Sequence, residues 1–173
     1  MTNTKKAVAI YTDGACLGNP GPGGYGAVLL YRGRRRELSG GFRRTTNNRM
    51  EILAAIMALR ALKEPCDVTL YTDSQYVAEA MTQGWAERWR ANGWRRNRNA
   101  QAVNPDLWQE LLDLCARHDV RFEWVRGHAG NRENERCDAL AVAAAHMPNL
   151  PADSGYESAS SGTAPGPPPA LLS

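Results

Sequence analysis

Two stretches of the sequence, AVAIYTDG (residues 7–14) and DVTLYTDS (residues 67–74), resemble each other and decide the fold. Each is rich in β-forming residues and ends in an aspartate, Asp13 or Asp73, that is followed by a turn or a helix start. The pattern predicts strands over 7–13 and 67–72. If these strands are parallel neighbours, both carboxylates lie at the same edge of the sheet, where α/β proteins place their ligands. The alternative is that each aspartate only caps the segment that follows it.

Apolar spacing, turn residues and caps predict the other elements. Strands over 24–31 and 34–42 are joined by a hairpin at Arg32-Gly33, and a further strand covers 120–125. A first helix is expected from Thr45 or Thr46 to about Lys63, with Ile52, Ile56 and Leu59 on its buried face. Further helices are expected over 74–83, around Trp85 and Trp89, from the cap Asn104-Pro105 to Arg117, and from Asn131 or Asn134 to His146. Hairpins imply antiparallel pairing and helical crossovers imply parallel pairing, so a mixed sheet with helices on its faces is predicted.

Length and composition point to one folded domain. The chain has 173 residues, of which 43% are hydrophobic and 23% charged, and this excludes wholesale disorder and a coiled coil. No apolar run approaches the roughly 20 residues of a membrane span, and the polar start lacks the apolar stretch of a secretory signal. The cysteines are scattered without metal-binding spacing, which favours reduced thiols in the cytoplasm; they are Cys16, Cys66, Cys115 and Cys137.

The C-terminal part of the chain differs in composition from the rest. Residues 148–173 hold six of the ten prolines, two acids and no Lys or Arg. We expect a folded domain over 1–157 and a disordered tail rich in Pro, Gly, Ser and Ala over 158–173, either solvated or binding a partner. The first 147 residues therefore carry all 21 basic and 16 of the 18 acidic residues, a net charge of +5 within an overall +3. Residues 85–98 alone carry +4.

The paired aspartates predict a metal site. Two clustered carboxylates repel each other and raise each other's pKa, and a divalent cation such as Mg²⁺ removes that penalty. Two further acids, Glu51 and Asp138, lie near helix starts, where an acid can also serve only to complement the helix dipole.

Five ordered motifs resemble those of bacterial type 1 ribonuclease H (ribonuclease HI) over about Lys5 to Tyr156. They are TDG (12–14), GNPGPGGYG (18–26), TTNNRME (45–51), TDSQYV (72–77), and GHAG (127–130) with NERCD (134–138). The resemblance implies a ribonuclease H-like fold, with a five-stranded mixed sheet flanked by helices on both faces. It also implies an endonuclease that hydrolyses the RNA strand of RNA–DNA hybrids and leaves 5′-phosphate and 3′-hydroxyl ends.

The resemblance assigns catalytic roles residue by residue. Two Mg²⁺ ions, for which Mn²⁺ can substitute, are expected on the four family carboxylates, with Asp13 bridging both ions; these acids are Asp13, Glu51, Asp73 and Asp138. His128, on a loop between glycines, is expected to accept or relay a proton, since a histidine pKa lies near neutrality. Asn134 is expected to orient the attacking water or His128.

Short polar side chains near the metals are expected to bind the substrate and to sense the RNA 2′-hydroxyl. Asn47, Asn48 and Gln75 are assigned to that hydroxyl. Cys16 and Asn19 are expected to contact the backbone, and Thr46 and Asn19 to form a pocket for a DNA-strand phosphate. The simpler alternative is that the Asn and Gly residues serve turn geometry.

A segment of interleaved tryptophans and arginines is predicted to bind the hybrid. Arginines neutralise phosphates and release counterions, while tryptophans pack on the DNA sugar-phosphate edge; the residues assigned are Trp85, Trp89, Trp94, Arg88, Arg95 and Arg96. Core packing of the tryptophans is the alternative. Relative to the family pattern, residues 83–85 hold one extra residue, and Asn131-Arg132 stands where His-Pro is more usual. The first difference affects the angle of this segment and the second affects the His128 loop.

The expected partner is the hybrid alone, with no membrane or obligate protein partner, and the chain is expected to be a monomer. The competing hypotheses are a nonhydrolytic hybrid-binding module and another nuclease or strand-transfer enzyme of the same fold.

Overall fold

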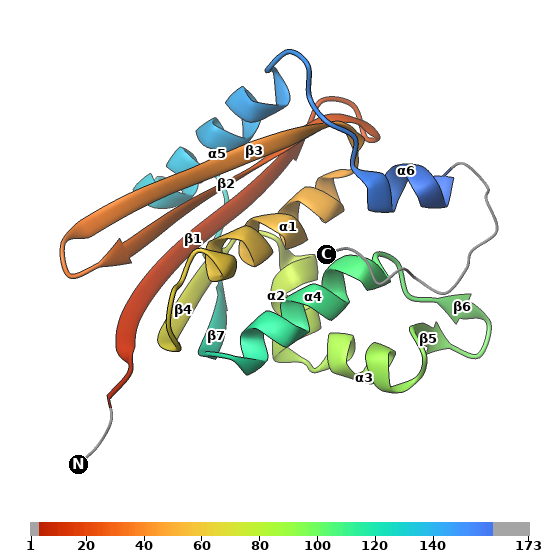
Figure 1. The fold of residues 1–173 in the computed structure, drawn as a ribbon, viewed down its shortest axis with the longest axis horizontal. Coiled ribbons are helices and arrows are strands. Elements are labelled where there is room, and N and C mark those ends of the chain that lie inside the picture. The colour runs from red at the N-terminus through yellow and green to blue at the C-terminus, as the bar shows by residue number, and fades with distance from the viewer. Residues whose placement is uncertain (1–3, 161–173) are drawn as a thin grey trace.

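The two similar stretches form neighbouring parallel strands at the centre of a five-stranded mixed sheet (Figure 1). The computed structural model describes residues 4–160, and the sheet order is β3-β2-β1-β4-β7. β1 pairs antiparallel with β2 and β2 with β3, whereas β4 pairs parallel with both β1 and β7. The strands are β1 (Lys6–Cys16), β2 (Gly21–Tyr31), β3 (Arg34–Thr45), β4 (Cys66–Thr72) and β7 (Asp119–Trp124). The register places Thr12 beside Thr72, so Asp13, still within β1, and Asp73, just past β4, lie at the same end of the two parallel strands, as predicted.

Helices cover both faces of this sheet, which confirms the predicted fold class (Figure 1). They are α1 (Asn47–Arg60), α2 (Gln75–Thr82), α3 (Trp85–Ala91), α4 (Pro105–Ala116), α5 (Arg132–Ala145) and α6 (Ser154–Ser160). α1 and α4 lie on one face and α5 on the other. The predicted inner face of α1, Ile52, Ile56 and Leu59, is fully buried in the main core, and each such side chain contributes about 1.5–3 kcal/mol by its burial. Within residues 4–160 no helix has the length and apolar character that crossing a membrane requires.

Two elements differ from the sequence prediction. A small hairpin, β5 (Arg95–Asn97) with β6 (Ala100–Gln101), follows α3, although its polar sequence shows no strand alternation. α6 extends to Ser160, so the tail predicted to begin at residue 158 is wrong for residues 158–160. The part of the helix before these residues is held in place, because Asp153 Oδ1 accepts a hydrogen bond from Tyr156 N and Glu157 pairs with Arg43. The rest of that tail, 161–173, lies outside the described residues.

Glycines on β2 allow α5 to lie very close to the sheet. A Cβ atom at Gly24 would stand 2.3 Å from the carbonyl oxygen of Ala141, and one at Gly26 would stand 2.4 Å from that of Cys137. The facing residues of α5 are mostly small, and Cys137, Ala141, Ala144 and Ala145 are buried against the sheet. The glycines of β2 and the small residues of α5 therefore pack against each other, and this packing sets the distance of α5, and with it Asp138, from the sheet.

Replacing Gly26 by Ala is expected to destabilise the protein by about 1–3 kcal/mol, because the added methyl group overpacks this interface. Urea unfolding measures the loss. Ala143→Ser, at an exposed position of the same helix, is the control and should stay within about 0.5 kcal/mol of the parent. Equal stability of the Gly26 variant and the parent would show that α5 shifts freely on the sheet.

Candidate active site

Three carboxylates from separate elements meet at the edge of the sheet. Asp13 lies near the end of β1, Glu51 on the second turn of α1, and Asp73 directly after β4. One carboxylate oxygen from each lies within 4.8 Å of the other two. Asp138, on α5, is outside this group, but its charge reaches Asp13 and contributes to raising the pKa of that carboxyl. The structure thus brings three of the four predicted acids together and places the fourth nearby.

Gly14 permits the close approach of β1 to α1. A Cβ atom at this position would stand 2.6 Å from both Glu51 N and the carbonyl carbon of Met50. The Gly14 N–H also donates a 2.8 Å hydrogen bond to Asp13 Oδ1. Gly14 therefore lets β1 approach α1 closely enough to bring Asp13 next to Glu51, and its N–H also holds the Asp13 carboxylate.

The purely structural alternatives for these acids do not hold for Asp73, Glu51 or Asp138. Ser74, not Asp73, caps α2, since its hydroxyl accepts a hydrogen bond from Val77 N. The first turn of α1 contains no acid, so Glu51 lies beyond the reach of a simple dipole role. The acids in the first turn of α5 are Glu133 and Glu135, and Asp138 lies one turn further on.

Burial and mutual repulsion make the cluster unfavourable without a cation. Asp13 is only 4% exposed, and burial, followed by the charge of Asp73, raises its pKa to about 8. Burial also raises the pKa of Glu51, which is 6% exposed, well above its usual range, and the charges of Asp13 and Asp73 add to the effect. Among the described residues Glu51 Oε1 is buried without a hydrogen-bond partner. Such an atom costs about 1–3 kcal/mol, and a hard cation such as Mg²⁺ is the partner that carboxylate oxygens suit.

The predicted proton-transfer residues lie beside this cluster on the segment between β7 and α5. His128 is exposed and has a φ of 54°, on a loop whose Gly127 lies against Asp73. Asn134 is buried in the first turn of α5, where its N–H donates to Asn131 Oδ1, the cap of the helix. Because Asn134 and Asp138 are four residues apart, they share one face of α5. The cap at Asn131 also confirms one of the two predicted helix starts.

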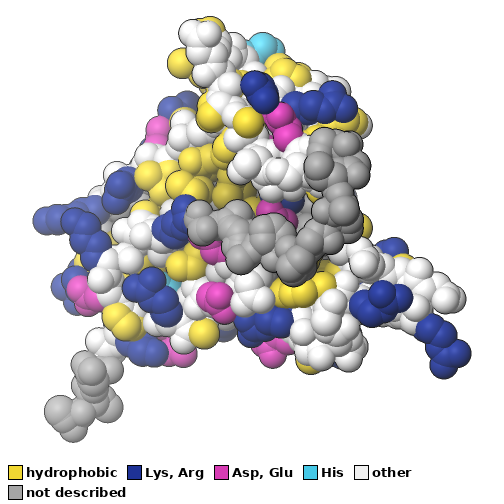
Figure 2. Space-filling view, turned by 45° about the vertical axis from the view of Figure 1, so that its right-hand side comes forward, with side chains coloured by type: hydrophobic (Ala, Val, Ile, Leu, Met, Phe, Trp, Pro, Cys, Tyr) yellow, Lys and Arg dark blue, Asp and Glu magenta, His cyan; other side chains and the backbone are white. Residues whose placement is uncertain are grey.

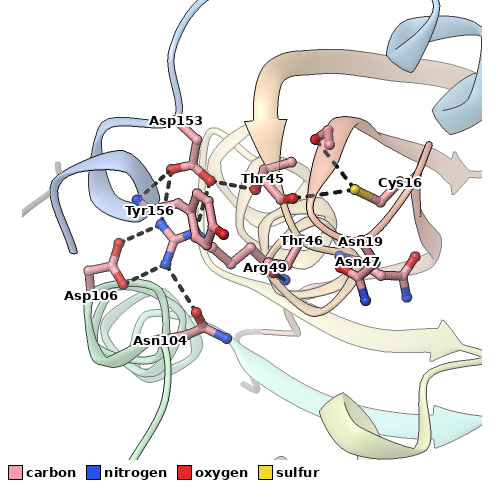
Figure 3. Close-up of polar contacts among 11 residues, drawn as sticks. Cys16, Asn19, Thr45, Thr46, Asn47, Arg49, Asn104, Asp106, Asp153 and Tyr156 are labelled. Atoms are coloured by element: carbon pink, nitrogen blue, oxygen red, sulfur yellow. Dashed lines mark hydrogen bonds and ion pairs between the residues drawn. The ribbon is translucent and has the colours of Figure 1, made fainter. Parts of the chain in front are cut away.

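The predicted backbone-binding residues gather at the N-terminus of α1 (Figure 3). Asn19 Oδ1 accepts a 3.0 Å hydrogen bond from Asn47 N, which ties the glycine-rich loop to the helix. The Cys16 thiol lies within hydrogen-bond distance of three carbonyl oxygens, nearest that of Gly18 at 2.9 Å and then those of Gly21 and Thr45 at 3.4 Å. Thr46 is the helix cap and accepts from Arg49 N. The turn-geometry alternative therefore applies to these residues as well, while Asn48 and Gln75 are exposed at the starts of α1 and α2.

The structure contains a buried ion cluster centred on Arg49 that the sequence did not predict (Figure 3). Arg49 is 3% exposed and pairs with Asp106 at 2.7 Å and Asp153 at 2.8 Å. Asp153 also accepts a 2.6 Å hydrogen bond from the Thr45 hydroxyl. Asn104 occupies the cap position of α4, as predicted, in a left-handed conformation. Its side-chain oxygen accepts a hydrogen bond from Arg49 and makes none to the helix. The cluster joins α1, α4 and α6 directly behind the N-terminus of α1.

The tryptophan–arginine segment forms α3 and the β5–β6 hairpin. Trp85, Trp89 and Trp94 are half-buried and pack against the main core, and Trp89 meets the fully buried Trp108 edge-on at 5.9 Å. Core packing therefore accounts for part of each ring. Arg88, Arg95 and Arg96 are exposed, and no ion pair within the described part of the chain neutralises them. In the face seen in Figure 2, basic side chains form the outermost projections on both sides of the molecule.

Comparisons with known proteins agree with this geometry. The family model described as RNase H matches residues 5–146. Ribonuclease H of Syntrophus aciditrophicus (strain SB) is 67% identical over 152 residues, which cover 88% of this chain and 88% of the relative. Among solved structures, LC9-RNase H1, described as a type 1 RNase H with the type 2 active-site motif, superposes with a TM-score of 0.76 at 37% identity and covers 92% of this chain and 83% of that one. LC11-RNase H1 in complex with RNA/DNA hybrid matches with a TM-score of 0.62 at 25% identity, over 79% of this chain and 95% of that one.

The match spans the sheet, the glycine-rich loop and all four acids, and the level of identity far exceeds what a shared fold alone produces. The resemblance noted in the sequence is thereby confirmed. The chain belongs to the ribonuclease H family and, within it, to type 1.

Proposed function

We propose that this protein is an endoribonuclease that hydrolyses the RNA strand of RNA–DNA hybrids with two bound Mg²⁺ ions and leaves 5′-phosphate and 3′-hydroxyl ends. The observation that carries the proposal is the buried group of Asp13, Glu51 and Asp73, in which one carboxylate oxygen lacks a partner among the described residues. A module that only binds hybrids gains nothing from three repelling acids in its interior. Family membership and the hybrid complex of LC11-RNase H1 support the same substrate.

The residues present fit the metal. Asp13, Glu51, Asp73 and Asp138 are the residues that would hold the ions. Asp13 is the acid we expect to serve both, since its charge interacts with those of Asp73, Asp138 and Glu51. When bound, Mg²⁺ lowers the pKa of a water, positions it for in-line attack and stabilises the departing 3′-oxygen, and Mn²⁺ has similar ligand preferences.

The protein supplies proton transfer, orientation and strand selection. His128 is exposed on its loop and can accept or relay a proton at the imidazole, while Asn134 orients the water or that ring from the same face of α5 as Asp138. Asn47, Asn48 and Gln75 offer neutral donors and acceptors to the 2′-hydroxyl beside the acids. Cys16, Asn19 and Thr46 hold the loop that contacts the backbone of the hybrid. We further propose that the protein acts as a monomer in the cytoplasm; the four free cysteines of the described chain support the compartment.

The proposal is tested by incubating the purified protein with an end-labelled RNA–DNA hybrid in Mg²⁺. Cleavage of the RNA strand into fragments with 3′-hydroxyl ends is expected, with no cleavage of double-stranded DNA or of double-stranded RNA. Chelation with EDTA should stop the reaction, and Mn²⁺ should restore it. A protein that binds the hybrid but leaves it intact in both metals is a binding module, and the proposal fails.

Replacing Arg95 and Arg96 together by Ala is expected to weaken hybrid binding and to reduce the salt slope of the affinity by about one unit for each lost phosphate contact. Binding is measured between low and moderate salt on a cleavage-deficient background. The matched control replaces Arg34 and Arg36, also exposed but on β3, so the net charge changes equally. An identical salt slope in both double variants would exclude the β5–β6 hairpin from the interface.

A further inference from the structure

The last residue of β7 and the first residues after it make repeated contact with Asp73 and its neighbour Thr72. The Val125 N–H donates a 2.9 Å hydrogen bond to the carbonyl oxygen of Thr72, which extends the β4–β7 ladder by one step. The Trp124 indole Nε1–H donates a 3.1 Å hydrogen bond to the carbonyl oxygen of Asp73 itself. Gly127 lies so close to the Asp73 carboxylate that a Cβ atom on it would stand 2.6 Å from Oδ2. Main chain and side chain of Asp73 are thus both contacted within a few residues.

Trp124 makes this contact from an unusual position for a tryptophan. Its side chain is 44% exposed, whereas Phe122, two residues earlier on the same side of β7, is buried in the core. The exposed part of a large ring contributes little hydrophobic stability, so burial alone does not explain why a tryptophan stands at position 124. The specific interaction that remains is the indole hydrogen bond to the first residue after β4.

The contacts answer a physical need at Asp73. The carboxylates of Asp13 and Glu51 repel that of Asp73, and the ladder between β1 and β4 ends one residue earlier, at Thr72. An acid placed just past the end of a strand moves outward under such repulsion unless its main chain is held. Trp124 holds the carbonyl, and the bare Cα of Gly127 leaves room for the carboxylate to remain in the cluster.

We infer that Trp124 and Gly127 are positioning residues for Asp73 and that they fix the start of the His128 loop to this metal-binding acid. The inference rests on the proposed function and deepens it. Since His128 follows Gly127 directly, the same contacts set where the proton-transfer loop begins relative to the carboxylates.

The test uses two variants of the full chain. Trp124→Phe retains an aromatic ring and removes the donor, while Gly127→Ala adds one methyl group against Asp73. Groups that hold a metal ligand in place typically contribute roughly 10–100-fold to metal affinity or activity. We expect Mn²⁺ binding to the protein without substrate, measured by calorimetry, to weaken by about 10-fold in each variant. We expect kcat on the hybrid to fall by a similar factor while KM changes little.

Ala129→Ser is the matched control, because it adds one atom at an exposed position of the same loop. It should bind Mn²⁺ and turn over like the parent. The unfolding midpoint of metal-free Trp124→Phe should equal that of the parent, which separates positioning from general stability. If Gly127→Ala does not fold, Trp124→Phe carries the test alone.

The outcomes separate this inference from the proposed function. Parent protein that cleaves the hybrid, together with Trp124→Phe that matches it in Mn²⁺ affinity and kcat, overturns the inference and leaves the function standing. A change confined to KM also overturns it, since that places Trp124 in substrate binding. Parent protein that does not cleave refutes the proposed function, and the Mn²⁺ affinities still decide the role of Trp124.

Discussion

Replacing Asp13 by Asn is expected to abolish hydrolysis of the hybrid, by at least about three orders of magnitude, and to make the metal-free protein more stable. The loss follows because Asp13 belongs to the buried acid cluster and is the ligand that we assign to both ions. The gain follows because the substitution removes a carboxyl whose ionised form is destabilised by burial and by Asp73. Hybrid binding should be retained, since the change leaves the exposed arginines in place.

The stability effect has a defined pH dependence. The pKa of Asp13 is about 8 in the folded protein and 3.8 in its ordinary state, so between these values the folded chain binds more protons than the unfolded one. The metal-free protein therefore loses stability as the pH rises from about 4 through about 8, by at most about 1.4 kcal/mol for each pH unit from this carboxyl. In Asp13→Asn the part of this loss that comes from Asp13 should be absent, while the part that comes from the buried Glu51 remains. The variant should therefore gain most over the parent above pH 8.

Urea unfolding in EDTA at several pH values measures the stability effect, and a hybrid-cleavage assay in Mg²⁺ on the same protein preparations measures the loss of activity. Asp67→Asn is the control, since Asp67 pairs with Arg121 on the surface and such a pair contributes about 0–1 kcal/mol. Retained turnover of Asp13→Asn would remove Asp13 from the ligand set. Parallel pH curves for the variant and the parent would show that the cluster is not strained without metal.

Replacing Arg49 by Met is expected to destabilise the protein by about 3–5 kcal/mol at neutral pH. Arg49 is the buried cation between Asp106 and Asp153, and its removal leaves two buried carboxylates without a counter-charge. Since Glu51 lies two residues along α1, cleavage activity should also fall.

Two further variants test the origin of this effect. Combining Arg49→Met with Asp106→Asn and Asp153→Asn should recover part of the stability, because the uncompensated charges are removed together with the arginine. Arg43→Ala breaks an exposed pair with Glu157 and should cost no more than about 1 kcal/mol. If Arg49→Met costs as little as Arg43→Ala, the cluster does not fasten α4 and α6 to α1.

Local patterns predicted most of the sheet and the acid site. The echo between residues 7–14 and 67–74 predicted parallel strands with Asp13 and Asp73 at one edge, because strand alternation and a terminal acid are readable within eight residues. Family motifs supplied Glu51 and Asp138, which no local rule distinguishes from acids at helix starts. The hairpin at Arg32-Gly33 was also predicted, and both residues have positive φ.

The features that were missed depend on distant partners. Arg49 reads as an ordinary exposed helix residue, since Asp106 and Asp153 lie 57 and 104 positions further along the chain. The β5–β6 hairpin is held by few backbone bonds and carries no apolar alternation, so its arginines indicated only charge. The sequence does not predict a role for Trp124, because that role depends on one hydrogen bond to Asp73 that sequence spacing does not reveal.

The glycine-lined seat of α5 has a mechanical consequence for the active site. At Gly24 and Gly26 helix backbone meets strand backbone with no side-chain cushion between them. Side chains can change rotamer to absorb a shift, whereas two backbones in contact cannot, so α5 neither slides nor rolls on the sheet. Asp138 is therefore carried on a stiff mount relative to Asp13. Any adjustment to metal or substrate is therefore expected in the short loop that carries His128 and not in α5, although the two segments are adjacent in the chain.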